Sequence, residues 1–242
     1  MKIYNKRKII PSIFTLGNLF CGFLAIVNVV ESSYISAAWW IIIAGIFDAL
    51  DGKVARITGG SSEFGIEFDS IADVVSFGIA PAVLFYYYIL SEAGSLGYFL
   101  AFCFLAAGAI RLARFNITAS TVKKTHFTGM PIPAGAGILA SFILFSENVW
   151  GGIENFDFVI FLIFFTSFAM VSGFKYSTLP KIGFSTKTDI LRSIWFISHI
   201  IFIVLYPDVV FFPTGIIYLL SGPAKYVTAP ALNHLLQKVN SR

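Results

Sequence analysis

The sequence predicts an all-α membrane protein, a bundle of about eight transmembrane helices, and three observations carry that prediction. Of its 242 residues, 57% are hydrophobic and only 12% are charged, about half the charged share of a soluble domain. The apolar residues gather in runs of about 20, the length that crosses a bilayer as a helix. Lys and Arg concentrate between alternate runs, as they do in multi-pass proteins.

The eight apolar runs form one predicted domain, residues 1–242, without internal repeats. The first run follows a basic segment, residues 2–8, but no small-residue cleavage site comes after it, so we interpret it as an uncleaved span rather than a signal peptide. In the last run, Gly222 and Pro223 are expected either to kink the helix or to end it early. The predicted spans are 11–30, 34–57, 69–91, 95–116, 131–147, 156–175, 190–206 and 209–229.

Charge placement predicts the orientation of the bundle. The turns after the first, third, fifth and seventh spans contain acidic residues and no Lys or Arg, so all 17 Lys and Arg fall on the other side or at helix ends that face it. The positive-inside rule then places both termini in the cytoplasm. Topology therefore explains the net charge of +4, and no nucleic-acid-binding motif suggests another use for it.

Four aspartates at helical spacing interrupt this apolar background. Asp48 and Asp51 are three residues apart near the end of the second span, and Asp69 and Asp73 are four apart at the start of the third. Each pair therefore shares one face of its helix. A short glycine-rich connection, residues 58–65, lets the two helices pack side by side and bring both pairs together just beneath the cytoplasmic surface.

A divalent cation, or two, is the predicted partner of these carboxylates. Carboxylates at membrane depth are costly and mark functional sites, and four of them together repel one another unless positive charge lies between them. Hard oxygen ligands suit Mg²⁺ or Mn²⁺. A salt-bridged helix end is the alternative, but the nearby cations, Lys53 and Arg56, are too few for four carboxylates.

Residues 48–73 follow the pattern Asp-x2-Asp-Gly-x2-Ala-Arg-x8-Gly-x3-Asp-x3-Asp. This pattern resembles the motif of the CDP-alcohol phosphatidyltransferase family, with every fixed position present. The resemblance implies transfer of a phosphatidyl group from a CDP-linked lipid to an alcohol, with release of CMP. It also implies two divalent ions that bridge the diphosphate, a helical bundle over most of the chain, and a homodimer.

The resemblance assigns roles to the motif residues. Asp48, Asp51 and Asp69 look like the core metal ligands. Asp73 looks like the last aspartate of the motif, close to the incoming hydroxyl, which makes it our choice of general base as well as a further metal ligand. The residues expected to bind the CDP-lipid are Asn18, Asp48, Asp51, Gly52, Ala55, Arg56, Gly65 and Lys124.

Physical arguments accompany several of these assignments. Gly52 has no side chain, so a nucleotide can approach its helix closely, and Arg56 suits the diphosphate or the cytidine. Taken outside the motif, the small residues Gly52, Ala55 and Gly65 would be better explained by helix packing. Asn18 is a buried amide that needs hydrogen bonds, and the resemblance suggests that the nucleotide or its phosphates supply them.

Three further segments resemble the branch of the family that makes phosphatidylserine: PSIFTLGNLFCGFLAI at 11–26, RLARFN at 111–116 and FTGMPIPAGAG at 127–137. This resemblance implies CDP-diacylglycerol, or an archaeal-type CDP-lipid, and L-serine as substrates. Serine brings a carboxylate, and Arg111 and Arg114, about one turn apart, are predicted to bind it bidentately. Contact with lipid headgroups explains each arginine equally well.

Other interpretations stay open at this point. A phosphorylated acceptor, such as glycerol 3-phosphate or inositol phosphate, would use the same motif, and Lys123 and Lys124 are available to meet its phosphate. A cation transporter is disfavoured because the outer halves of the spans are apolar. An inactive lipid-binding relative is disfavoured because no motif aspartate is missing.

Two expectations concern structure alone. Thr15, in the first span, is expected to bond its own helix backbone. Pro131 and Pro133 are expected at the start of the fifth helix, where proline is well tolerated, and this position explains them without a role in binding.

Overall fold

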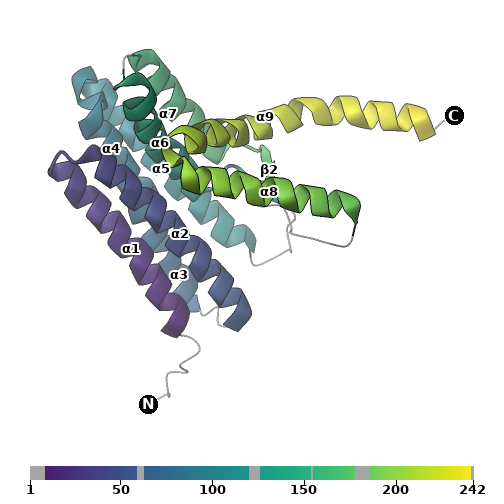
Figure 1. Ribbon diagram of the computed structural model, residues 1–242, viewed down its shortest axis with the longest axis horizontal. Helices are drawn as coiled ribbons and strands as arrows, with labels where there is room; N and C mark the ends of the chain where they lie inside the picture. The colour runs from purple at the N-terminus through teal and green to yellow at the C-terminus, as the bar shows by residue number, and fades with distance from the viewer. Residues whose placement is uncertain (1–8, 59–62, 120–125, 154, 178–185, 241–242) are drawn as a thin grey trace.

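The structure, a computed structural model, describes residues 9–58, 63–119, 126–153, 155–177 and 186–240. Most of them belong to helices. The helices of the first half of the chain run roughly alongside one another, and the last two, α8 (Lys187–Leu205) and α9 (Pro207–Asn240), lie across them in Figure 1. Among the described residues, six helical segments are long and apolar enough to cross a membrane. The chain is therefore a multi-pass helical membrane protein, as the sequence predicts.

The first half of the bundle contains four long helical segments. A tight turn at Ser32, whose φ is 58°, joins the first two. In the third segment, two α-helices are joined without a break by a π-helical turn that begins directly after Asp73. The elements are α1 (Ile9–Val30), α2 (Tyr34–Thr58), α3 (Glu63–Asp73), η2 (Val74–Ile79), α4 (Ala80–Tyr88), the short 3₁₀ helix η3 (Leu90–Ala93) and α5 (Ser95–Ala119).

The second half contains α6 (Ile132–Phe145), which continues into a π-helical turn, η4 (Ser146–Trp150), and then α7 (Phe156–Val171), α8 (Lys187–Leu205) and α9 (Pro207–Asn240). Sequence sets several of their starts. Pro131 precedes α6, and the side chains of Asn155 and Thr186 cap α7 and α8 by accepting hydrogen bonds from the N–H groups of Phe158 and Asp189.

Every predicted span largely coincides with a helix, but three boundaries differ by four residues or more. The sixth helix ends at Val171 rather than at 175, and Lys175 begins a short β-strand. The third helix begins at Glu63 rather than at 69, so Gly65 lies in a helix and not in a loop. The last helix continues through Pro223 to Asn240, so the early end considered for it is wrong. Because α7 is shorter than a full span and α9 is not among the six, a count of eight transmembrane helices stays a prediction.

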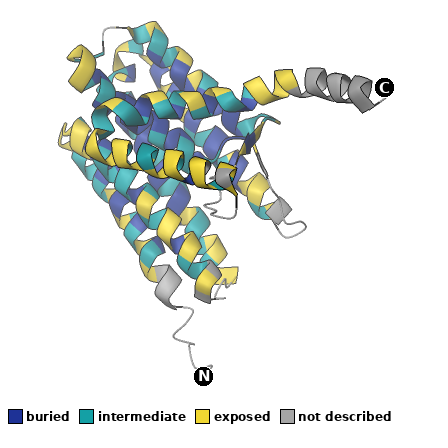
Figure 2. Cartoon of the chain, turned by 45° about the vertical axis from the view of Figure 1, so that its right-hand side comes forward, coloured by how far each residue is buried: buried dark blue, intermediate teal, exposed yellow. Residues whose placement is uncertain are grey.

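The core lies where α1, α2, α4, α5, α6 and α7 meet. Large side chains such as Phe77, Phe85, Phe104 and Phe142 are almost fully buried there. Figure 2 shows in yellow the exposed positions on the outward faces. Many exposed residues are large and apolar, which suits a surface covered by lipid tails. Helix α8 is the most exposed of the six apolar helices. It packs on α9, and only 6% of its residues 188–205 are buried.

A two-stranded antiparallel ribbon joins the connection between α5 and α6 to the connection between α7 and α8. The sequence did not predict this ribbon. β1 (His126–Thr128) pairs with β2 (Lys175–Ser177), and Phe127 lies opposite Tyr176. The Tyr176 hydroxyl donates a 3.0 Å hydrogen bond to the carbonyl oxygen of Leu219 in α9. The ribbon therefore joins the connections before α6 and after α7 to the last helix.

Gly129 makes the turn from β1 to α6. Its φ is 78°, and a Cβ atom there would lie 2.3 Å from the carbonyl oxygen of Met170, so no other residue fits without displacement. Its N–H donates to the carbonyl oxygen of Phe174 at 2.9 Å. These contacts fix the start of α6, and Pro131 and Pro133 at this start line a cavity between α2, α3 and α5.

Candidate active site

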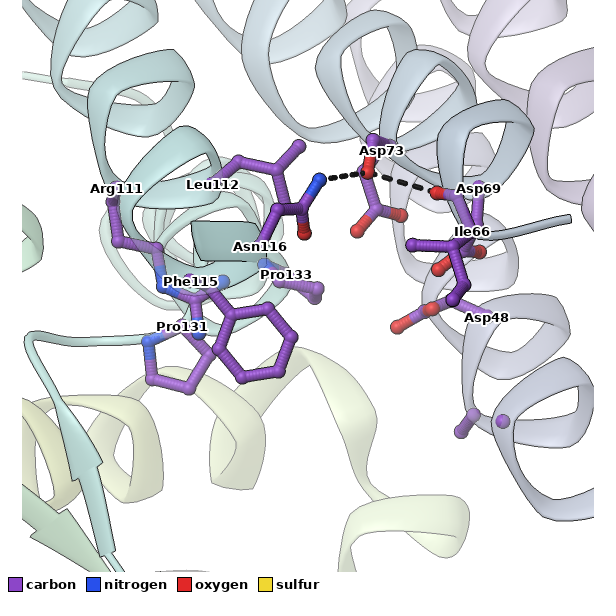
Figure 3. A pocket seen from close by; sticks show the side chains of 13 residues that line it. Asp48, Ile66, Asp69, Asp73, Arg111, Leu112, Phe115, Asn116, Pro131 and Pro133 are labelled. Carbon is purple, nitrogen blue, oxygen red and sulfur yellow. Dashed lines mark hydrogen bonds between the residues drawn. The ribbon is translucent and has the colours of Figure 1, made fainter. Parts of the chain in front are cut away.

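The side chains of Asp48, Asp69 and Asp73 converge between α2 and α3. Each offers a carboxylate oxygen, and these oxygens all lie within 4.8 Å of one another. Figure 3 shows the three carboxylates on neighbouring helices, facing one cavity. The helical spacing within the sequence and the adjacency of α2 and α3 therefore produce the predicted cluster, with three of its four members in it.

Asp51, the fourth aspartate, lies beside this cluster but does not line the cavity. It is 6% exposed, and its Oδ2 accepts a hydrogen bond from the Thr15 hydroxyl of α1. It stays close enough for its charge to act on both Asp48 and Asp69. Thr15 thus reaches another helix, a contact that the expected bond to its own helix backbone did not include.

The donor set fits a divalent cation. The Oδ1 atoms of Asp51 and Asp69 are buried, and neither has a hydrogen-bond partner among the described residues. A buried carboxylate oxygen without a donor is unfavourable, and so is the approach of several like charges. A cation bound by these carboxylates would relieve both costs, and carboxylate oxygens are the ligands that Mg²⁺ and Mn²⁺ prefer.

The cavity beside the cluster has a volume of about 660 Å³, a common size for a small-molecule site. Helices α2, α3 and α5 and the start of α6 form its walls. Its lining residues are Asp48, Ala49, Gly52, Ile66, Asp69, Ser70, Asp73, Arg111, Leu112, Phe115, Asn116, Pro131 and Pro133.

Gly52 gives this cavity open space on the α2 side. It is exposed, and a Cβ atom built on it would meet nothing within 4 Å. Packing therefore does not require glycine here. This agrees with the prediction that a missing side chain leaves room for a ligand, and it argues against helix packing as the reason for this glycine.

The structure separates the two predicted serine-binding arginines. Arg111 is 7% exposed, lines the cavity and interacts electrostatically with Asp48 and Asp73. Figure 3 shows it across the cavity from the carboxylates. Arg114 does not line the cavity, and its Nη1 donates a 2.7 Å hydrogen bond to the carbonyl oxygen of Val171 in α7. Of these two arginines, Arg111 is the one placed to meet a ligand beside the aspartates.

Several lining residues were not predicted. A dashed chain in Figure 3 runs from Asn116 Nδ2 to Ser70 Oγ at 2.8 Å and on to the carbonyl oxygen of Ile66 at 2.9 Å, linking α5 to α3. Phe115 lies four residues after Arg111, so helical spacing from the predicted arginine would have found it. The assignment of Pro131 and Pro133 to helix initiation alone is incomplete, because both also line the cavity.

The remaining predicted residues have varied positions. Ala55 and Gly65 are partly buried in α2 and α3 and do not line the cavity. Asn18 does not line it either; it is fully buried, and its Nδ2 donates a 3.1 Å hydrogen bond to Asp73 Oδ1. The side chain of Arg56 and all of Lys124 lie outside the described residues.

A second hollow of about 350 Å³ adjoins the cavity between α3, η2 and α5. The two share Ser70, Leu112 and Asn116, and the rest of its lining is mostly apolar, including Ile71 and Val74. The cavity that holds the carboxylates therefore meets a mostly apolar hollow at the Ser70–Asn116 hydrogen bond.

Comparisons with known proteins agree with this geometry. A sequence profile described as CDP-alcohol phosphatidyltransferase matches residues 8–174. A CDP-diacylglycerol–serine O-phosphatidyltransferase from Helicobacter pylori is 37% identical over 189 residues, covering 77% of this chain and 79% of that protein. A protein of the same name from Methanocaldococcus jannaschii is 38% identical over 181 residues, covering 74% and 80%.

An archaetidylserine synthase from Methanothermobacter thermautotrophicus is 34% identical over 185 residues and covers 73% of each chain. The matched profile includes all four aspartates and ends before α8, so α1 to α7 carry the likeness. This chain belongs to the CDP-alcohol phosphatidyltransferase family.

Proposed function

We propose that this protein transfers a phosphatidyl-type group from a CDP-linked lipid to the hydroxyl of L-serine, giving a phosphatidylserine-type lipid and CMP. The observation that carries the proposal is the placement of Arg111 in the same cavity as the carboxylates of Asp48, Asp69 and Asp73. A zwitterionic acceptor whose hydroxyl must reach a base and whose carboxylate needs a cation fits that arrangement.

Asp48, Asp51, Asp69 and Asp73 are the proposed holders of one or two divalent cations, Mg²⁺ or Mn²⁺. When bound, the cations supply positive charge that stabilises the diphosphate oxygens as charge develops on them. The protein's own part is to hold hard oxygen ligands at one depth between α2 and α3. The bare oxygens of Asp51 and Asp69 support this assignment.

Asp73 is the proposed general base. It is 6% exposed and lines the cavity, and one of its two oxygens already accepts a hydrogen bond from Asn18. Its carboxylate takes the proton of the serine hydroxyl as the serine oxygen attacks the lipid-side phosphorus. A new P–O bond forms to serine, the P–O bond to CMP breaks, and CMP leaves with the bonding electrons. Direct attack of this kind inverts the configuration at phosphorus.

Arg111 is the proposed ligand of the serine carboxylate. A guanidinium presents two parallel N–H groups to a carboxylate, which fixes both the distance and the orientation of the acceptor. When serine is held in this way, with its hydroxyl directed at Asp73, a bimolecular step becomes effectively unimolecular. Gly52 leaves room for the nucleotide on the opposite wall.

The CDP-lipid is proposed to enter from the bilayer. Its diphosphate lies at the carboxylates, and the adjoining apolar hollow, which includes Ile71 and Val74, suits the lipid end. Relatives carry the names of both diacylglycerol- and archaetidyl-type enzymes, so both kinds of tail are candidates for this chain. The cytoplasmic location of the site, with both termini on that side, rests on the positive-inside rule.

Two further parts of the proposal come from the family resemblance. The chain is a single catalytic domain over residues 1–242, and ribbon contacts such as Tyr176 to Leu219 support the inclusion of α9. The active form is a homodimer.

The direct test is transfer from CDP-diacylglycerol to radiolabelled L-serine by the purified protein, with Mg²⁺, Mn²⁺ or a chelator. Glycerol 3-phosphate and inositol phosphate serve as parallel acceptors. Metal-dependent lipid product from serine alone supports the proposal. Product from a phosphorylated acceptor instead would keep the carboxylate site and reject the assignment of Arg111 to serine, and no product from folded protein with any acceptor would reject the activity.

A further inference from the structure

Two polar side chains of α1, three residues apart, reach the aspartates of two other helices. The Thr15 hydroxyl donates to Asp51 Oδ2 on α2, and Asn18 Nδ2 donates to Asp73 Oδ1 on α3 at 3.1 Å. Thr15 is 2% exposed and Asn18 is 0% exposed. Figure 1 shows α1 beside both α2 and α3, so one helix spans the pair that carries the site.

Asn18 is connected to α3 and its π-helical turn through its backbone as well. Its carbonyl oxygen accepts a 2.9 Å hydrogen bond from the hydroxyl of Ser76, which is fully buried. One turn further along α1, a Cβ atom on Gly22 would lie 2.3 Å from Ser76 Oγ and 2.7 Å from Ser76 Cα. The backbones of α1 and η2 are therefore in close contact directly beside Asp73, and that contact holds the Asn18 amide in place.

We propose that Thr15 and Asn18 are positioning residues of the active site, which set the orientation of the Asp51 and Asp73 carboxylates from a third helix. The inference rests on the proposed function. It replaces the prediction that Asn18 binds the nucleotide, because the Asn18 amide is buried against Asp73 and does not line the cavity.

The physical reason lies in the freedom of a carboxylate. A free aspartate rotates about χ1 and χ2 and presents either oxygen in any direction, whereas a buried hydrogen bond to one oxygen fixes the direction of the other. Thr15 engages Oδ2 of Asp51 and leaves Oδ1 without a partner among the described residues. Asn18 engages Oδ1 of Asp73 and leaves Oδ2 for the acceptor hydroxyl or a cation.

Groups that orient a metal ligand or a catalytic base typically contribute about 10–100-fold to metal affinity or activity. A displacement of about 1 Å at a base can cost about 100-fold in rate. The variant Thr15→Val keeps the shape and removes the donor, and Thr15→Ser keeps the donor. Asn18→Leu keeps approximate size and removes the amide. Ser141→Ala is a matched control, since Ser141 is also fully buried but bonds the carbonyl oxygen of Ile138 in its own helix.

The experiment measures Mn²⁺ binding by calorimetry on the detergent-solubilised proteins, and kcat and KM for both substrates. We expect Thr15→Val to weaken Mn²⁺ binding about 10-fold or more and Thr15→Ser to restore it. We expect Asn18→Leu to lower kcat about 10–100-fold with little change in the KM for the CDP-lipid. Ser141→Ala should match the wild type, and thermal unfolding separates loss of fold from loss of position.

Three results would overturn the inference. Wild-type Mn²⁺ affinity in folded Thr15→Val would remove Thr15 from this role. A raised KM for the CDP-lipid with unchanged kcat in Asn18→Leu would return Asn18 to direct nucleotide binding. If Thr15→Ser and Thr15→Val were equally impaired, the hydroxyl would not be the cause. Mn²⁺ binding does not depend on the acceptor, so failure of serine transfer in the wild type would reject the proposed function and the role of Asn18 beside the general base, while the Mn²⁺ titrations would still test Thr15.

Discussion

The guanidinium carbon of Arg111 lies 5.2 Å from the centre of the Phe115 ring, one turn along the same face of α5. An arginine over an aromatic face is attracted by the negative electrostatic potential of that face, and the contact limits the directions in which the guanidinium can point. Both residues line the cavity that holds the carboxylates of α2 and α3, so the contact restricts the guanidinium on the wall of that cavity.

We expect Arg111→Lys to raise the KM for serine about 10–100-fold, with a smaller effect on the KM for the CDP-lipid. Lysine keeps the charge but loses the fork that binds a carboxylate through two hydrogen bonds, and a charged hydrogen bond is worth about 1.5–3 kcal/mol. Serine saturation curves provide the measurement. Arg114→Lys is the matched control, because Arg114 bonds Val171 and does not line the cavity. Equal effects of the two variants would contradict the assignment.

Gly52→Ala should impair substrate binding without harming the fold. The added Cβ meets no neighbour within 4 Å, and alanine is favoured over glycine inside a helix by about 1 kcal/mol, so the unfolding midpoint should stay the same or rise. The side chain would instead occupy the cavity, and the KM for the CDP-lipid should rise, more steeply still for Gly52→Leu. A normal KM for the lipid in both variants would show that nothing approaches this wall.

Gly222→Ala is expected to have the opposite profile. A Cβ atom on Gly222 would lie 2.4 Å from Tyr176 Cζ, and the ring of Tyr176 is fully buried and bonded to Leu219. Overpacking of about 1–3 kcal/mol exceeds the gain of about 1 kcal/mol in helix propensity. The thermal midpoint should therefore fall, with substrate KM values unchanged in the protein that remains folded. An unchanged midpoint would mean that Tyr176 and its strand move away from α9 at little cost in stability.

Local sequence pattern predicted the helices and the convergence of three of the four aspartates, because apolar runs and spacings of three and four residues depend on one element at a time. The convergence of Asp48, Asp69 and Asp73 needed only two adjacent helices joined by a short connection, and this prediction is confirmed. The start of α3 at Glu63 was missed because the glycine-rich segment before it contains strong turn formers.

Such local patterns could not predict contacts between elements that are far apart in the sequence. Nothing near Thr15 indicates a partner 36 residues away, and the pairing of Asn18 with Asp73 spans 55 residues. The β1–β2 ribbon joins two three-residue strands too short to show alternation. Arg111 and Arg114 carry the same charge one turn apart, so only the position of α5 against its neighbours separates the arginine that lines the cavity from the one bonded to Val171.

Removal of divalent metal should abolish transfer, and Asp69→Asn should weaken Mn²⁺ binding at least about 10-fold. The amide keeps the size of the carboxylate but removes the charge and one strong ligand oxygen. Asp157→Asn is the control, since Asp157 is an exposed acidic residue in the first turn of α7, away from the cluster. Calorimetry with Mn²⁺ checks the result, and full activity in a chelator would reject a metal at this site.

The orientation of the bundle can be measured by cysteine labelling in intact cells. Replacing Cys21 and Cys103 by alanine gives a background without cysteine, and single cysteines then go in at exposed positions, Glu92→Cys in η3 or Thr188→Cys at the start of α8. If the excess of Lys and Arg marks the cytoplasmic side, a membrane-impermeant maleimide will label position 92 in intact cells and position 188 only after permeabilisation.

This measurement also locates the chemistry. Asp48 and Asp51 lie in the last three turns of α2, and Asp69 lies two turns into α3, so the cluster is near the end of the bundle where those helices connect. Charge placement assigns this end to the cytoplasm, where free serine can reach Arg111. The reversed labelling pattern would place the aspartates on the outer face and would contradict both the predicted topology and the cytoplasmic supply of acceptor.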